Sequence, residues 1–248
     1  MRRLLIVLVA GAVLLAPVST AYAWQPGREA AVEYAHSRAG RISFAVMNER
    51  GRMFRYRARR QFESASVIKA MFLVAYLRQR SVRARELTSE ERHLLSPMIR
   101  RSDNDAATAI ANRLGPARIY RLARDARMRR FSYTRPWGLS RITAADQARF
   151  FKRLDDYLPR MHEGYAHYLL SHIVVSQRWG IPQAKPDGWK LLFKGGWGSG
   201  TGWVCHQVAV LKDGRRQISV AILIGDSPSH AYATETLEGL ARRLLRGL

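Results

Sequence analysis

The sequence predicts a fold of the α/β class, of the α+β type, in which a five-stranded antiparallel sheet is flanked by the terminal helices and joined to an all-helical lobe. Two segments with strand composition lie near the start of the chain, three more lie near its end, and the residues between them have helical patterning. Strands bury their apolar faces by pairing in one sheet and packing against helices. We therefore expect the first and last helices to cover one face of that sheet.

The first 23 residues have the composition of a secretory signal peptide. Arginines follow Met1, residues 4–15 are almost entirely apolar, and residues 21–23 form a small-aromatic-small cleavage pattern. The apolar run is short for a membrane anchor, so we expect no integral membrane segment after cleavage and a secreted protein, extracellular, periplasmic or associated with the cell wall. The expected mature domain is 24–248, with a sheet lobe at about 24–65 and 185–248 and a helical lobe at about 66–184.

The first half of this domain begins with a helix and two strands and continues with helices. The composition of 48–51 is typical of a turn between two strands. Thr88 and Glu91 form a capping box that begins a helix, and Gly115 ends another. The predicted elements are a helix at 26–38, strands at 41–47 and 52–57, helices at 66–80 and from residue 88, and helices at 104–114 and 116–126.

The second half returns from helices to strands. Thr143 and Asp146 cap a helix, and Asp213-Gly214 is a two-residue hairpin signal between the last two strands. A groove between the sheet and the helical lobe is the expected position of a site. The predicted elements are helices at 143–154 and 162–176, strands at 189–197, 203–211 and 217–225, and a closing helix at 231–245.

The chain is strongly basic, with a net charge of +23 and 42 Lys and Arg against 19 Asp and Glu. Most of these cations are arginines and they are spread along the sequence, as a GC-rich genome alone would also produce. A basic surface attracts polyanions. Because no segment resembles a nucleic-acid-binding module, we interpret the charge as favouring anionic cell-wall polymers and not nucleic acid.

Cysteine and histidine give no metal-site pattern. Cys205 is the single cysteine, so an intramolecular disulfide and a Cys-x-x-Cys zinc site are excluded. Three histidines spaced by five do not form the pair of a metal-binding helix. His206 lies in a predicted strand, where a packed histidine is the more ordinary interpretation than a groove residue. We expect the tryptophans to occupy the core or the walls of the groove, where one or two of them could stack on a sugar or an acyl chain. They are Trp137, Trp179, Trp197 and Trp203.

Ser66 and Lys69 begin a helix that is apolar nearly all round. A lysine in such a helix is costly unless it is paired or used. Residues at i and i+3 share a helix face, so Lys69 lies close enough to take the proton of Ser66, and burial would lower its pKa and make it a base. The alternative is a capping serine followed by a lysine that extends to solvent.

Two further segments have polar residues where chemistry could use them. Ser102-Asp103-Asn104 precedes an Ala-rich helix and could cap it, or could relay a proton and hold an amide. Lys194 lies within an apolar strand and is followed by two glycines, which would let a ligand approach the backbone. An edge strand with a solvated lysine would give the same pattern.

Together, Ser66-x-x-Lys69, Ser102-Asp103-Asn104 and Lys194-x-Gly resemble the motif set of class A β-lactamases and penicillin-binding proteins, over essentially the whole mature chain. The resemblance implies an acyl-enzyme mechanism without a metal or organic cofactor. It implies that Ser66 is the acylated nucleophile, Lys69 its proton partner and Ser102 the proton relay. It also implies a catalytic Lys194 that supports Ser102 and attracts the substrate carboxylate. Substrate contacts are implied for Asn104, Gly195, Gly196 and Trp197, with oxyanion donors at the N–H of Ser66 and that of Trp197 or Gly198.

The chain departs from the family pattern in two places. Gly195 stands where a Thr or Ser hydroxyl usually holds the substrate carboxylate, a role that Ser199 or Thr201 would have to supply. No carboxylate occurs between Asp125 and Asp146, where β-lactamases of the family place the glutamate that activates the deacylating water.

We expect a secreted serine hydrolase acting on β-lactams or peptidoglycan-derived peptides. The alternatives are a cell-wall peptide-binding or sensing protein with weak or no turnover, and a basic surface protein whose partner is an anionic polymer.

Overall fold

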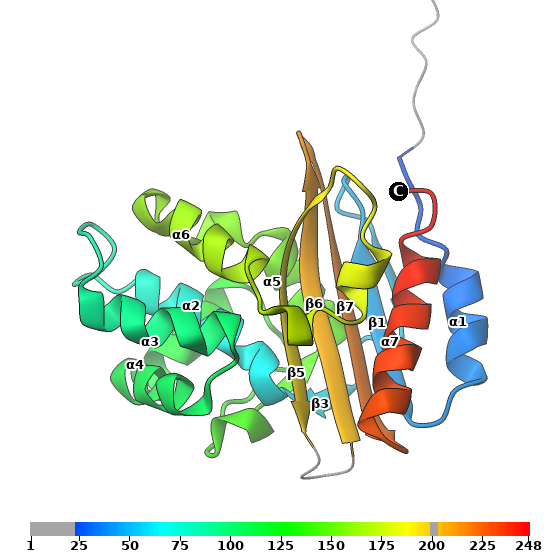
Figure 1. Ribbon diagram of the computed structural model, residues 1–248, viewed down its shortest axis with the longest axis horizontal. Helices are drawn as coiled ribbons and strands as arrows, with labels where there is room; N and C mark the ends of the chain where they lie inside the picture. Colours follow the sequence, from blue (N-terminus) through cyan, green and yellow to red (C-terminus); the bar gives the residue numbers. More distant parts are fainter. Residues whose placement is uncertain (1–22, 199–202) are drawn as a thin grey trace, which may run out of the picture.

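A computed structural model describes residues 23–198 and 203–248. The predicted signal peptide falls almost wholly outside these residues, as do Ser199 and Thr201. The chain forms a five-stranded antiparallel sheet with helices on both faces (Figure 1). No helix in the described ranges is long and apolar enough to cross a membrane.

The sheet has the order β2-β1-β7-β6-β5, which confirms the prediction that the first two strands join the last three. Its members are β1 (Arg41–Met47), β2 (Met53–Tyr56), β5 (Lys190–Gly198), β6 (Trp203–Asp213) and β7 (Arg216–Ser227). The terminal strand β1 pairs with β7 along its whole length. As a result β2 and β5 are the two edges of the sheet, and β5 is the edge beside the helical lobe.

Two helices from opposite ends of the chain pack side by side on one face of the sheet. These are α1 (Arg28–His36) and α7 (His230–Leu244), as predicted (Figure 1). The remaining helices lie on the other side, where α5 packs on β1, β6 and β7. They are α2 (Ile68–Leu77), α3 (Ser89–Arg100), α4 (Asn104–Asp125), α5 (Ala144–Lys152) and α6 (Arg160–Ser171).

Local capping signals place several of these helices correctly. Thr88 accepts a hydrogen bond from the N–H of Glu91, whose side chain accepts one in return from the Thr88 N–H, so the predicted capping box is present. Thr143 caps α5 by accepting from the Asp146 N–H. Gly115, at φ 65°, interrupts α4 where the sequence predicts one helix ending and another beginning.

The structure corrects three details. The helix predicted at 162–176 is α6, which begins at Arg160 and ends at Ser171, before a β-branched run. The two-residue hairpin loop consists of Gly214 and Arg215, one residue later than predicted, because Asp213 still pairs with Arg216. Two short strands, β3 (Gln61–Glu63) and β4 (Arg141–Thr143), were not predicted, since each has three residues and its partner lies far away in the sequence.

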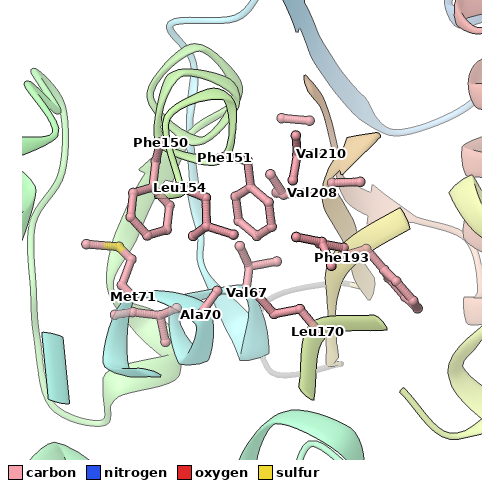
Figure 2. Packing of buried hydrophobic residues seen from close by; sticks show 14 of the residues in the cluster. Val67, Ala70, Met71, Phe150, Phe151, Leu154, Leu170, Phe193, Val208 and Val210 are labelled. Carbon is pink, nitrogen blue, oxygen red and sulfur yellow. The ribbon is translucent and has the colours of Figure 1, made fainter. Parts of the chain in front are cut away.

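Helix α2 packs against α3, α4 and α6 in the helical lobe, and every residue from Ile68 to Leu77 is buried. Figure 2 shows Val67, Ala70 and Met71 packed against side chains of α5 and the sheet. Burying one large apolar side chain contributes about 1.5–3 kcal/mol. The start of α2 is therefore fixed by packing on several sides, which confirms the prediction of a buried helix.

Candidate active site

Ser66 lies in η1 (Ala65–Val67), a short 3₁₀ turn that leads into α2. It is partly exposed, whereas its neighbours Ser64 and Val67 are buried. The turn is held by a hydrogen bond of 2.7 Å from the Ser64 N–H to the carbonyl of Ser140. Ala65 adopts φ 42°, a conformation that a non-glycine residue keeps only where its surroundings enforce it. The surrounding core thus presents Ser66 at the start of a rigid helix.

Lys69 is fully buried one turn along from Ser66. Its Nζ donates to the backbone carbonyl of Ser102 at 2.5 Å, to Asn104 Oδ1 at 2.8 Å and to Ser102 Oγ at 3.3 Å. Burial lowers the pKa of Lys69 to about 7, against an opposing effect of Asp103. A lysine with this pKa exchanges a proton readily near neutral pH.

Lys194 extends from β5 toward Ser102, the serine that Lys69 also contacts. Its side chain is fully buried, and Nζ donates to Ser102 Oγ at 3.0 Å and to the carbonyl of Gly195 at 2.8 Å. Burial, followed by the nearby charge of Lys69, lowers the pKa of Lys194 well below its usual value. Ser102, at φ 59°, therefore holds its hydroxyl between two buried amines.

Neither lysine forms a salt bridge with a carboxylate of the described chain. Burying a charged amine without a partner is costly, which is why both pKa values are lowered, and a carboxylate bound beside the lysines would favour their charged forms. In the described residues no hydrogen bond joins Ser66 Oγ to Lys69, whose donors are directed to Ser102 and Asn104. Direct proton transfer between Ser66 and Lys69 stays a prediction.

The two glycines after Lys194 have different surroundings. A Cβ on Gly196 would lie 2.7 Å from the backbone N of Ser66, 2.8 Å from that of Val67 and 3.2 Å from the carbonyl of Ser64. Only glycine allows β5 to approach the Ser66 turn so closely. A Cβ on Gly195 would have no contact shorter than 3.7 Å, so a side chain at that position is sterically allowed. The residue after them, Trp197, continues β5 and pairs with Cys205.

The loop that lacks a carboxylate packs directly on the Ser66 turn. Ser64 Oγ lies 3.4 Å from the carbonyls of Trp137 and Gly138. The Lys69 ammonium lies 4.9 Å from the centre of the Trp137 ring, and the indole N–H donates to Thr108 Oγ1 at 3.1 Å. Sequence reasoning placed Trp137 only as a core or groove-wall residue, because its approach to Lys69 depends on the fold of the loop.

His206 is a second residue whose role the sequence did not reveal. It is fully buried, its Nε2 donates to the carbonyl of Glu63 at 2.8 Å, and its Nδ1 accepts from the N–H of Ile224 at 3.1 Å. These bonds connect the sheet to β3, which leads into the Ser66 turn. Burial lowers the pKa of His206 to about 4 and keeps the imidazole neutral.

Other reactive groups lie outside this site. Cys205 is buried, and burial raises the pKa of its thiol. Asp155, Glu163 and His167 bring potential metal-ligand atoms within 4.8 Å of one another, a grouping that the histidine spacing did not suggest. Asp155 is already paired with both His167 and Lys212, and the lysine charge would repel a cation.

Comparisons with known proteins agree with this architecture. A family profile, Beta-lactamase2, described as a beta-lactamase enzyme family, matches residues 85–248. No match was found among curated proteins. Among solved structures, a beta-lactamase from Sphaerobacter thermophilus is 18% identical at a TM-score of 0.77, covering 89% of this chain and 96% of that one. An ancestral class A beta-lactamase is 21% identical at a TM-score of 0.76, covering 90% and 100%.

A beta-lactamase from Xanthomonas campestris pv. campestris is 18% identical at a TM-score of 0.74 and covers 89% of this chain and 97% of that one. Identities this low show a shared fold. The family profile begins at residue 85 and does not include Ser66 or Lys69. The positions of these two residues come from the structure alone. With the profile covering most of the sequence and the fold shared with class A enzymes, the chain belongs to the class A-like Beta-lactamase2 family of serine hydrolases.

Proposed function

We propose that this chain is a secreted serine hydrolase, a single domain over residues 24–248, that forms an acyl-enzyme at Ser66 with β-lactams or peptidoglycan-type peptides. The observation that carries the proposal is the convergence of two buried amines, Lys69 and Lys194, on the hydroxyl of Ser102 beside the Ser66 turn. Burying two amines without a carboxylate partner is costly for a purely structural role. The family membership of the chain supports the same chemistry.

In the proposed reaction Ser66 Oγ attacks the amide carbonyl and its proton passes to neutral Lys69. The C–N bond then breaks, and the leaving nitrogen takes a proton through Ser102, which lies within hydrogen-bond distance of both lysines. Asn104 uses Oδ1 to accept from Lys69, so its amide NH₂ is the group left to bind a substrate carbonyl. Addition of water to the ester releases the acid and restores the Ser66 hydroxyl.

Deacylation is the slow step in this proposal. The loop beside Ser66 has no carboxylate between Asp125 and Asp146, and it places the Trp137 ring over Lys69. A water near the ester would then depend on a buried amine, Lys69 in this proposal, as its base. The absent hydroxyl at Gly195 also weakens binding of the substrate carboxylate, by about 0.5–1.5 kcal/mol for one neutral hydrogen bond.

The test is a stopped-flow reaction with a chromogenic cephalosporin, followed by intact-mass and peptide-mass measurements. We expect a burst of one equivalent, a slow steady phase, and an adduct on Ser66. The adduct should be lost in Ser66→Ala and kept in Ser64→Ala, which removes a neighbouring buried hydroxyl. A stable adduct without a steady phase would favour the second candidate, a cell-wall peptide-binding or sensing protein, for which Gly195 and the carboxylate-free loop also argue. Absence of any Ser66 adduct would contradict both candidates.

A further inference from the structure

A groove lined mainly by arginine runs along the β2 edge of the sheet. It is formed by β2, the turn that follows it and the start of α1, and it has a volume of about 810 Å³. Six of its ten lining residues are arginines and none is acidic. All six are exposed: Arg28, Arg52, Arg55, Arg57, Arg59 and Arg60.

These guanidinium groups have no carboxylate partner. Within residues 23–198 and 203–248, ten other arginines form salt bridges with Asp or Glu, and none of the six does. Arg52 and Arg57 lie over the rings of Phe54 and Tyr56, at 5.1 and 5.0 Å from the ring centres. Gathered like charges repel one another and attract counter-ions, so the groove is a site prepared for several anionic groups.

Arginine abundance alone does not produce this arrangement. A second cavity of about 720 Å³ is also lined by five arginines, but it contains Asp156, and its Arg78 is paired with Asp125 at 2.6 Å. Charge in that cavity is partly neutralised by the protein itself. In the β2 groove no lining residue is acidic, so a bound ligand would have to neutralise the arginine charge.

We propose that the arginine groove binds a linear cell-wall polymer made of polyol or sugar units joined by phosphates. Guanidinium groups bind phosphate oxygens in a bidentate manner, and the rings of Phe54 and Tyr56 support the guanidinium groups of Arg52 and Arg57 that lie over them. The six arginines lie along one strand, the turn after it and the start of α1, a row that a linear chain of phosphates can follow. The wall origin of the polymer rests on the proposed secretion of the protein.

The position of the groove suits a tether. The order β2-β1-β7-β6-β5 places it at one edge of the sheet, while Lys194 and the Ser66 turn lie at the other. A polymer bound along β2 would leave the Ser66 site open. The chain would thus be held on the wall without losing access to substrate.

The test compares binding of the full mature chain to poly(glycerol phosphate), to single-stranded DNA of equal charge and to anionic phospholipid vesicles, over a series of salt concentrations. The test variant is Arg55→Gln/Arg59→Gln/Arg60→Gln, whose side chains make no hydrogen bond, ion pair or ring contact with the described residues, so the fold should be kept. The control Arg80→Gln/Arg83→Gln/Arg121→Gln removes equal charge from the second cavity.

We expect poly(glycerol phosphate) to bind most tightly, and the test variant to lose tenfold or more in affinity. The slope of the logarithm of the binding constant against the logarithm of salt concentration should decrease in magnitude by about three, since each lost phosphate contact lowers it by about one. The control should lose less than about threefold if contact and not net charge decides binding, and both variants should acylate Ser66 at the unaltered rate. Equal losses in the two variants, or tighter binding of DNA or vesicles, would overturn the proposal.

Discussion

The close approach of β5 to the Ser66 turn makes Gly196→Ala a sharp test of the proposed site. The added methyl group would lie 2.7 and 2.8 Å from the backbone nitrogens of Ser66 and Val67. Favourable contacts between such atoms lie at about 3.5–4.0 Å, so β5 and the turn must separate by several tenths of an ångström. All the atoms approached are backbone atoms, which cannot rotate away as a flexible side chain could.

The expected effect follows from two consequences of this separation. Overpacking of this kind costs about 1–3 kcal/mol of stability. The methyl group also covers the Ser66 N–H, the proposed oxyanion donor, and loss of one such donor lowers the rate by about 10²- to 10³-fold. We therefore expect acylation to slow by about 100-fold or more, with a smaller effect on folding.

Gly195→Ala is the matched control, since its methyl group would have no contact shorter than 3.7 Å. Acylation rates with a reactive penicillin would be measured by quenched-flow mass spectrometry, and stability by thermal unfolding. Gly195→Ala should stay within about threefold of the wild-type rate, because contacts at that distance are ordinary packing. If Gly196→Ala acylated at the wild-type rate, the reasoning that β5 contacts the Ser66 turn would be wrong.

Two pH-dependent properties follow from buried groups. Lys69 acts as a base only when neutral. Its pKa of about 7 therefore predicts an acylation rate that falls about tenfold per pH unit below pH 7 and is constant above it. An acylation rate that does not change from about pH 5 to pH 9 would exclude this role. His206 has a pKa of about 4 in the folded chain, below its unfolded value of about 6.5. Between about pH 6.5 and pH 4 only the unfolded state binds a proton at this residue, so the free energy of unfolding decreases as the pH falls through that range. Between pH 7 and pH 4, the free energy of unfolding should therefore fall by up to about 3 kcal/mol more in the wild type than in His206→Gln, as measured by denaturant titration. An equal fall in both proteins would contradict this prediction.

Local signals in the sequence were sufficient for most of the secondary structure. The capping residues Thr88 and Thr143 act on N–H groups three residues away, and Gly115 interrupts α4 by its own conformation, so each is readable without the fold. The buried helix after Ser66 was predictable because no face of it is polar. Strands β3 and β4 were not, since three residues carry no periodicity and their pairing is long-range.

For the site, the sequence indicated which residues could do chemistry, and the family match agrees with that interpretation. The apolar surroundings of Lys69 and Lys194 in the sequence indicated that each would need a partner or a use if buried, because burying an unpaired charge is costly, but left open that each extends to solvent. Only the tertiary structure decided that both meet at Ser102, that Gly196 contacts the Ser66 turn, and that Trp137 lies over Lys69. Those contacts join residues from separate helices, loops and strands, and their distances are set by packing of the whole core, which no local pattern encodes.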